Sequence, residues 1–202
     1  MNLTDIFPIA IGTKTLTSLT PDLIRRAIEL VDKSERVDMG ADGSCTSEQH
    51  FLDHPLLSDV KREVIDVCRE LSRAYSHEVE DIGICNSWAN IVGNGQSIQS
   101  HRHNNSYISG SLYLTDGSPI SISNPTFLSL FGFMPRINDN NPRSWAAYLL
   151  KPEPGMVVVF PSGLQHGVTQ SRSDRKRYSI AFNSIPLGEI GLPTSLIDLR
   201  MG

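Results

Sequence analysis

The sequence has few cysteines, no long apolar run and no excess of positive charge. Its three cysteines, Cys45, Cys68 and Cys85, form no Cys-x-x-Cys pair, which argues against a disulfide framework and against a zinc ribbon. The formal net charge is −4, so no basic field would recruit nucleic acid or an anionic membrane. No apolar run approaches the length of a membrane span, and residues 1–7 lack the basic and apolar regions of a secretory signal. We therefore expect a reduced, cytoplasmic protein that binds neither nucleic acid nor membrane.

The length and composition indicate one globular domain. A chain of 202 residues is long enough for one well-filled core and short for two. A content of 39% hydrophobic and 20% charged residues is that of an ordinary folded protein. We expect a single domain over 1–202, with a helical part over about 1–80, a barrel over about 81–186 and a tail over 187–202.

The first part of the chain has helical periodicity. Thr20 and Pro21 form a helix start, and the apolar residues that follow recur on one face. A stronger amphipathic helix is predicted from about Ser58 to Tyr75. Residues 38–47 between them are rich in Gly, Asp and Ser and are predicted to form a loop.

The second part changes to short strands separated by turn residues. The predicted strands are 82–92, 107–114, 120–123, 146–150, 156–160 and 178–184. Many short strands without intervening helices indicate an antiparallel sandwich or barrel, with the helices packed outside it. Residues 124–145 form a longer, Pro- and Asn-rich segment, which we predict to be a mobile flap over the site.

Three histidines are the strongest candidates for a metal site. His101 and His103 stand at i and i+2, a spacing that places both rings on one side of a strand. His166 follows an apolar strand and a tight turn, which would deliver it to the same pocket from a neighbouring strand. Imidazoles from separate strands suit a first-row transition metal.

Arg177 is the candidate anion-binding residue. It starts an apolar, alternating run, and its parity places it on the same strand face as Ser179 and Ala181. A buried arginine needs an anionic partner, and the local sequence provides none. The carboxylate of a ligand is therefore a good candidate, and a metal beside a carboxylate fork is typical of an iron enzyme that uses a keto acid.

These residues resemble the non-haem Fe(II), 2-oxoglutarate-dependent oxygenases, in particular small bacterial and phage members that are similar to prolyl hydroxylases. The matching segments are 88–90, 95–103, 109–114, 154–166 and 177–183. The resemblance implies a double-stranded β-helix, a squashed jelly-roll or cupin-like barrel that is mainly β with flanking helices. It also implies Fe(II), 2-oxoglutarate and O2 as cofactor and cosubstrates, and hydroxylation of a small-molecule or peptide substrate with release of succinate and CO2.

Mapped onto this sequence, the resemblance implies that His101 and His166 ligate iron and that Arg177 and Ser179 bind the distal carboxylate of 2-oxoglutarate. Tyr113 and Asn90 would be further contacts to the cosubstrate. The chain departs from the family at His103, because the family has Asp or Glu there. We expect the His103 imidazole to be the third ligand, in a site one charge unit more positive. Asp116 is an alternative source of a carboxylate, although its spacing is poor.

Two other functions remain open. A metal-binding cupin that ignores 2-oxoglutarate would share the barrel and both histidine segments, but the cupin glutamate after His-x-His is missing and Arg177 would have no role. An oxygenase relative that binds metal and keto acid without turnover is the other alternative, and the departure at His103 is its best support. Substrate identity and oligomeric state do not follow from the sequence.

Overall fold

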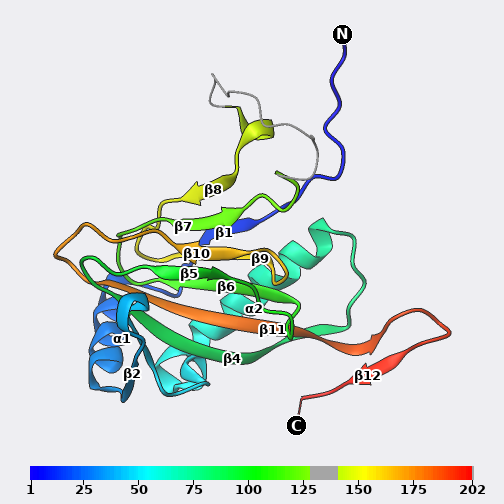
Figure 1. Ribbon diagram of the computed structural model, residues 1–202. Coiled ribbons are helices and arrows are strands. Elements are labelled where there is room, and N and C mark those ends of the chain that lie inside the picture. Colours follow the sequence, from blue (N-terminus) through cyan, green and yellow to red (C-terminus); the bar gives the residue numbers. More distant parts are fainter. Residues whose placement is uncertain (128–140, 202) are drawn as a thin grey trace.

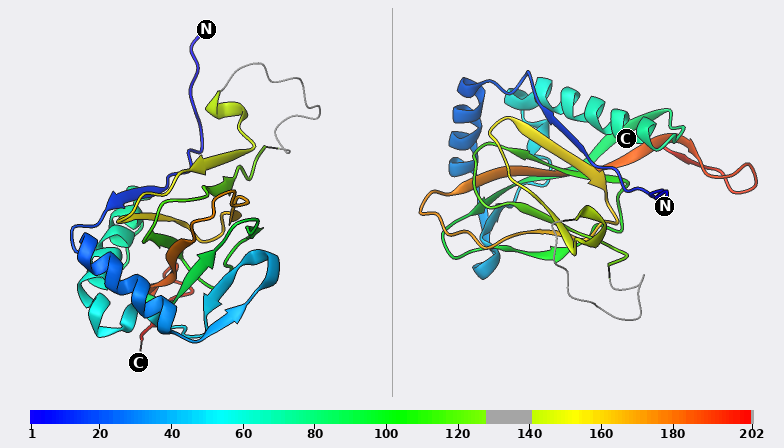
Figure 2. Two further views of the ribbon diagram at one scale, coloured as in Figure 1. Left: turned by 90° about the vertical axis from the view of Figure 1, so that its left-hand side faces the viewer. Right: turned by 90° about the horizontal axis from the view of Figure 1, so that it is seen from above.

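The structure is a computed structural model that describes residues 1–127 and 141–201. Two antiparallel sheets pack face to face (Figure 1; the layers are seen edge-on in the left view of Figure 2). The larger sheet has the strand order β1 (Gly12–Thr15), β9 (Met156–Pro161), β6 (Ile108–Tyr113), β11 (Arg177–Ile190), β4 (Asp81–Val92), β3 (Ser44–Thr46), β2 (Arg36–Asp38), and β12 (Ile197–Leu199) pairs with β11. The smaller sheet has the order β5 (Ile98–His101), β10 (His166–Val168), β7 (Ile120–Ser123), β8 (Ala147–Leu150). The predicted double-stranded β-helix is confirmed.

Two helices cover the outer face of the larger sheet (Figure 2). Helix α1 (Pro21–Lys33) starts as predicted, because the Thr20 side chain accepts a hydrogen bond from the Leu23 amide at 3.3 Å. Helix α2 (Ser58–Ala74) buries one apolar stripe, which consists of Val60, Val64, Val67, Cys68 and Leu71. Within the described part of the chain, no helix is long and apolar enough to cross a membrane.

The side chains of the larger sheet point alternately to its two faces. On β11, Tyr178, Ile180 and Phe182 belong to the core under the helices. The alternate residues of β11, from Arg177 onward, face the space between the sheets, as the two-residue period of a strand requires. A smaller apolar cluster that includes Phe160 and Ile122 closes part of that space. The sheet therefore carries its packing residues on one face and its polar residues on the other.

Two predictions of local structure need correction, and strands β1, β5 and β10 lie outside the predicted strand ranges. The predicted loop 38–47 contains β3, the end of β2 and a 3-10 turn, η1 (Gly40–Asp42), because β3 completes the sheet edge by pairing with β4. The predicted tail from 187 continues β11 and forms a hairpin with β12. Strand β1, which pairs with β9, was not predicted. Further 3-10 turns are η2 (Phe51–Asp53), η3 (Pro55–Leu57) and η4 (Pro142–Ser144).

The predicted flap over 124–145 lies largely outside the described residues. Of its described ends, Asn124 accepts hydrogen bonds from the backbone and hydroxyl of Thr126, and Asn141 caps η4. The proposal that this segment closes over the site is not tested by the residues that the structure describes.

Candidate metal and keto-acid site

The three predicted histidines come together between the sheets. His101, at the end of β5, and His166, at the start of β10, are directly paired strand neighbours, and their ring centroids lie 4.6 Å apart. The His103 ring lies 5.0 Å from that of His101 and 5.3 Å from that of His166. One ligand atom from each residue falls within 4.8 Å of the others, so the three imidazoles can share one metal ion.

His103 reaches this cluster by a different route from the predicted one. Strand β5 ends at His101, so the two side chains do not share a strand face. The His103 backbone amide instead donates to the Ser162 carbonyl at 3.1 Å, which ties this turn to the end of β9. The Trp88 ring stacks edge-on against the His103 ring at 6.0 Å. The convergence of the rings is therefore set by a turn and by packing.

Hydrogen bonds and burial prepare the imidazoles for a metal. Nδ1 of His101 lies 2.8 Å from the Gln99 carbonyl, and Nδ1 of His166 lies 2.8 Å from the Leu164 carbonyl. An Nδ1–H that donates to a carbonyl leaves Nε2 as the free ligand atom. Burial lowers the pKa of His166 to about 4, and burial also lowers the pKa of His103. These two rings are therefore neutral at pH 7, the form that binds metal.

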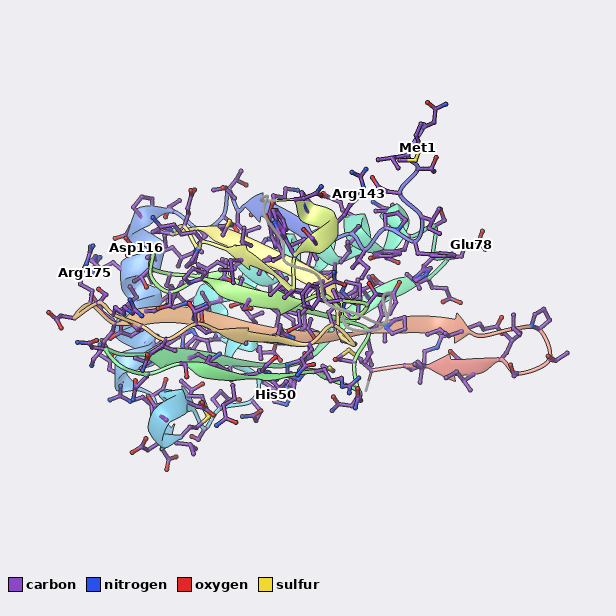
Figure 3. The ribbon with its side chains drawn as sticks, turned by 45° about the horizontal axis from the view of Figure 1, so that its top comes forward. Met1, His50, Glu78, Asp116, Arg143 and Arg175 are labelled. Atoms are coloured by element: carbon purple, nitrogen blue, oxygen red, sulfur yellow. The ribbon has the colours of Figure 1, made fainter. Side chains whose placement is uncertain are left out.

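The cluster contains no carboxylate. A cavity of about 200 Å³ holds the three histidines and Arg177, and no Asp or Glu is among the residues that line it within the described ranges. Asp116 does not approach it. Its carboxylate lies 3.9 Å from the Arg175 guanidinium at one end of the sheets (Figure 3). The suggestion that Asp116 supplies a ligand is thus not supported, and the departure at His103 stands.

Arg177 is the buried cation of the same cavity. Its side chain is 2% exposed, donates to the Ser179 hydroxyl at 3.0 Å, and lies with Cζ 5.0 Å from the centroid of the Tyr113 ring. Within the described residues no carboxylate pairs with it, and both Arg177 Nε and the Tyr113 hydroxyl are buried without a hydrogen-bond partner. Burial lowers the pKa of this guanidinium, so the site favours an anion that would offset the cost of its desolvation.

Sheet register brings the other two candidate residues to Arg177. Ser179 on β11 pairs with Asn90 on β4 and with Tyr113 on β6, so the three form one cross-strand row. Gly117 packs directly on the arginine, because a Cβ placed there would lie 3.0 Å from Arg177 Cβ. The four residues implied as cosubstrate contacts are therefore neighbours, and three of them, Asn90, Arg177 and Ser179, line the cavity.

Trp88 is a site residue whose role was not predicted from the sequence. It is half-buried, lines the metal cavity, and its Nε1 donates to Asn90 Oδ1 at 3.2 Å. Its position two residues before Asn90 on a strand gives both the same face, and this spacing was the available signal.

Comparisons with known proteins agree with this geometry. The family model described as "Putative 2OG-Fe(II) oxygenase" matches residues 86–183, the segment that carries every residue of the cavity described above except Met39. None of the curated proteins matches the chain.

Solved structures with the same fold include two whose descriptions mention 2-oxoglutarate and one prolyl-4-hydroxylase. The carbocyclase SnoK from nogalamycin biosynthesis has a TM-score of 0.65 at 13% identity, covering 89% of this chain and 81% of its own. HygX from Streptomyces hygroscopicus, with nickel, 2-oxoglutarate and hygromycin B bound, has a TM-score of 0.61 at 11% identity, covering 88% and 83%. A prolyl-4-hydroxylase from Pseudomonas putida has a TM-score of 0.58 at 16% identity, covering 87% and 92%.

The fold is a double-stranded β-helix, and the family model that matches residues 86–183 is that of an oxygenase. Over this segment the chain is similar to the 2OG-Fe(II) oxygenases, and the similarity supports a 2-oxoglutarate-dependent non-haem iron dioxygenase. Fe(II), 2-oxoglutarate and O2 are the cofactor and cosubstrates that fit this similarity and the histidine cluster.

Proposed function

We propose that this chain, acting as a single domain, hydroxylates a C–H bond of a small-molecule or peptide substrate. One oxygen atom of O2 would enter the substrate and the other would enter succinate, as 2-oxoglutarate loses CO2. The observation that carries the proposal is the pairing, in one cavity, of three convergent imidazoles with a buried arginine that lacks an anionic partner among the described residues.

The residues fit the groups that the family uses. His101, His103 and His166 would hold Fe(II), because neutral imidazole is a suitable ligand for this ion. Arg177 would bind the distal carboxylate of 2-oxoglutarate, with Ser179 beside it. When bound, Fe(II), 2-oxoglutarate and O2 supply the oxidising power for the C–H bond.

The protein's own residues would position and protect these groups. The carbonyls of Gln99 and Leu164 fix the tautomer and tilt of two imidazoles. The Tyr113 ring covers one face of the guanidinium, which keeps water away from the ion pair that would form there. The unpartnered Tyr113 hydroxyl is available to donate to the cosubstrate.

Charge distinguishes this site from that of the general family. Fe(II) contributes +2, 2-oxoglutarate −2 and Arg177 +1, so with three neutral histidines the occupied site would carry +1. A carboxylate in place of His103 would bring the sum to zero. The departure therefore favours substrates that tolerate or offset a positive site, and it is the feature that supports the alternative of binding without turnover.

Succinate release tests the proposal. We expect the purified protein, supplied with ascorbate, to convert 2-oxoglutarate to succinate in a reaction that needs both Fe(II) and O2 even without the true substrate, because ascorbate can supply the two electrons that the substrate C–H bond would otherwise provide. Omission of either Fe(II) or O2 provides the matched control. Binding of iron and keto acid with no succinate above the controls would instead establish the non-catalytic alternative, and iron binding without keto-acid binding would establish the cupin alternative.

A further inference from the structure

A second cavity adjoins the histidine cluster on the side away from Arg177. It has a volume of about 270 Å³, and Trp88 and His103 line both it and the metal cavity, so the two share a wall. Four carboxamides line the second cavity: Gln49, Asn86, Asn105 and Asn183. We call it the amide groove. None of its lining residues in the described ranges is Asp, Glu, Lys or Arg, so its only groups that could carry charge are the His103 ring and one thiol.

The sheet register builds the floor of the amide groove. Asn183 on β11 pairs with Asn86 on β4 and with Ser109 on β6, which forms a cross-strand row parallel to the row that contains Ser179. Along β11 the step from Arg177 to Asn183 is six residues, or roughly 20 Å. The inner face of the larger sheet thus has a cationic end and a neutral amide end, and the histidines lie between them.

The carboxamides of the groove retain unused hydrogen-bonding capacity. Asn183 is 3% exposed, and its Oδ1 accepts a hydrogen bond from the Ser109 hydroxyl at 2.7 Å, which leaves its amide nitrogen as a donor for a ligand. Among the residues that the structure describes, the one hydrogen-bonding approach to the Asn86 side chain comes from the Cys85 thiol, at 3.9 Å. The Asn105 side chain makes no hydrogen bond to any described residue.

The carboxamides of the amide groove are complementary to one kind of ligand group. Each carboxamide offers a donor and an acceptor in a fixed plane, and the ligand group with the same pair in the same plane is another amide. A charged ligand group would be desolvated in the groove without an opposite charge, which is costly. The lining therefore favours a neutral amide over an ammonium or a carboxylate.

We propose that the amide groove binds a neutral amide of the substrate, either a peptide bond or a primary carboxamide, and so holds a neighbouring C–H bond at the metal. The inference rests on the proposed oxygenase function and names the substrate class of that site. Asn86 and Asn183 act as specificity-determining residues, and Trp88 is the wall between the amide and the metal.

Cys45 provides a readout that does not depend on turnover. It is half-buried and lines the groove, whereas Cys85 is half-buried outside the groove lining and serves as an internal control. Burial raises the pKa of both thiols, so alkylation with N-ethylmaleimide is followed at mildly alkaline pH by peptide mass spectrometry. The protein is first loaded anaerobically with Fe(II) and 2-oxoglutarate, and keto-acid binding is recorded separately by visible absorption.

Two amides serve as probes. N-acetylalanine N′-methylamide represents a peptide bond and propionamide represents a primary carboxamide, with acetate and glucose as the anionic and polyol comparisons. We expect at least one amide to slow alkylation of Cys45 several-fold while Cys85 reacts at an unchanged rate. The amide that protects Cys45 at the lower concentration shows whether the groove binds a peptide bond or a primary carboxamide.

Variants separate specific binding from general protection. Asn86→Leu should raise the amide concentration needed to protect Cys45 at least tenfold. Asn94→Leu removes an exposed carboxamide that is hydrogen-bonded to Asp174, and it should leave this concentration unchanged. The proposal would be overturned if neither amide protected Cys45, or if glucose or acetate protected it equally well. It would also be overturned if Asn86→Leu were protected at the same amide concentration as the wild type. Because keto-acid binding is measured in the same samples, its loss would count against the proposed oxygenase function and not against the groove alone.

Discussion

His101 and His166 are direct partners across β5 and β10, and this one register pairing places two imidazoles from distant parts of the chain 4.6 Å apart. Each ring is held by a carbonyl two residues before it, Gln99 for His101 and Leu164 for His166. The same local geometry thus occurs on both strands, and it points the remaining nitrogen of each ring towards the shared space. His103 completes the cluster from the turn after β5.

Replacement of His166 tests the metal cluster. We expect His166→Ala to lose stoichiometric Fe(II) binding, because two imidazoles without a third donor hold a first-row metal weakly. Metal content after anaerobic reconstitution and desalting measures the effect. The control is His50→Ala, an exposed histidine (labelled in Figure 3) that belongs neither to the cluster nor to the lining of its cavity. Retention of one iron per chain in His166→Ala would remove His166 from the ligand set.

Replacement of Arg177 tests the carboxylate fork. Arg177→Leu should retain iron but lose about 2–5 kcal/mol of 2-oxoglutarate affinity, the usual scale for removing one partner of a buried, hydrogen-bonded charge pair. Isothermal titration of the metal-loaded protein measures it. Arg175→Leu, on the exposed turn beside Asp116, is the matched control and should bind normally. Equal affinities in the two variants would place the distal carboxylate elsewhere.

His103→Asp tests the unusual ligand. We expect it to retain iron and to raise succinate release, because an anionic donor brings the charge of the occupied site closer to zero. His103→Asn has nearly the same shape as the aspartate variant without its charge, and it should not show the gain. If His103→Asp instead loses iron, the native centre requires three imidazoles.

The pH dependence of stability tests a contact between helix α2 and the segment that follows β1. Partial burial opposes ionisation of Glu63, but hydrogen bonds from Ser18 and Thr17 outweigh it and hold its pKa below the usual value. A lowered folded-state pKa gives stability that is present above the unfolded-state pKa and is lost as the pH falls through the folded-state pKa. Glu63→Gln should therefore lower the free energy of unfolding by about 1 kcal/mol at neutral pH.

Denaturant titrations of both proteins between neutral pH and pH of about 3 would measure this difference. The two free energies of unfolding should converge on acidification, because the wild-type carboxylate is then protonated. A difference that stays constant down to the acid limit would show that the charge of Glu63 does not contribute.

The sequence predicts much of this structure because several features are local. The helix start at Thr20 is set by one side-chain hydrogen bond, and the six predicted strands correspond to β4, β6, β7, β8, β9 and β11. The position of Arg177 on the inner face follows from the two-residue strand period, which depends only on spacing.

Features that depend on pairing between distant segments were not predictable. Strands β2 and β3 flank the Gly- and Asp-rich turn at 39–43, which has the composition of a loop. Strand β3 forms because the edge of β4 is available to pair with it, and β2 in turn pairs with β3. Trp88 is a large apolar residue of a type usually found in a core. It becomes part of the site because the turn that carries His103 places that ring against the Trp88 ring. The amide groove is also of this kind, because register alone brings Asn86 and Asn183 together.

The central claim is that a metal held by the three histidines and a keto acid held by Arg177 occupy one cavity. An anaerobic visible-absorption titration of the metal-free protein with Fe(II), and then with 2-oxoglutarate, tests it most directly. The account predicts that a charge-transfer band develops only after the keto acid is added, and that the band needs a far higher keto-acid concentration in Arg177→Leu. Iron binding with no band at any concentration of 2-oxoglutarate would contradict the claim.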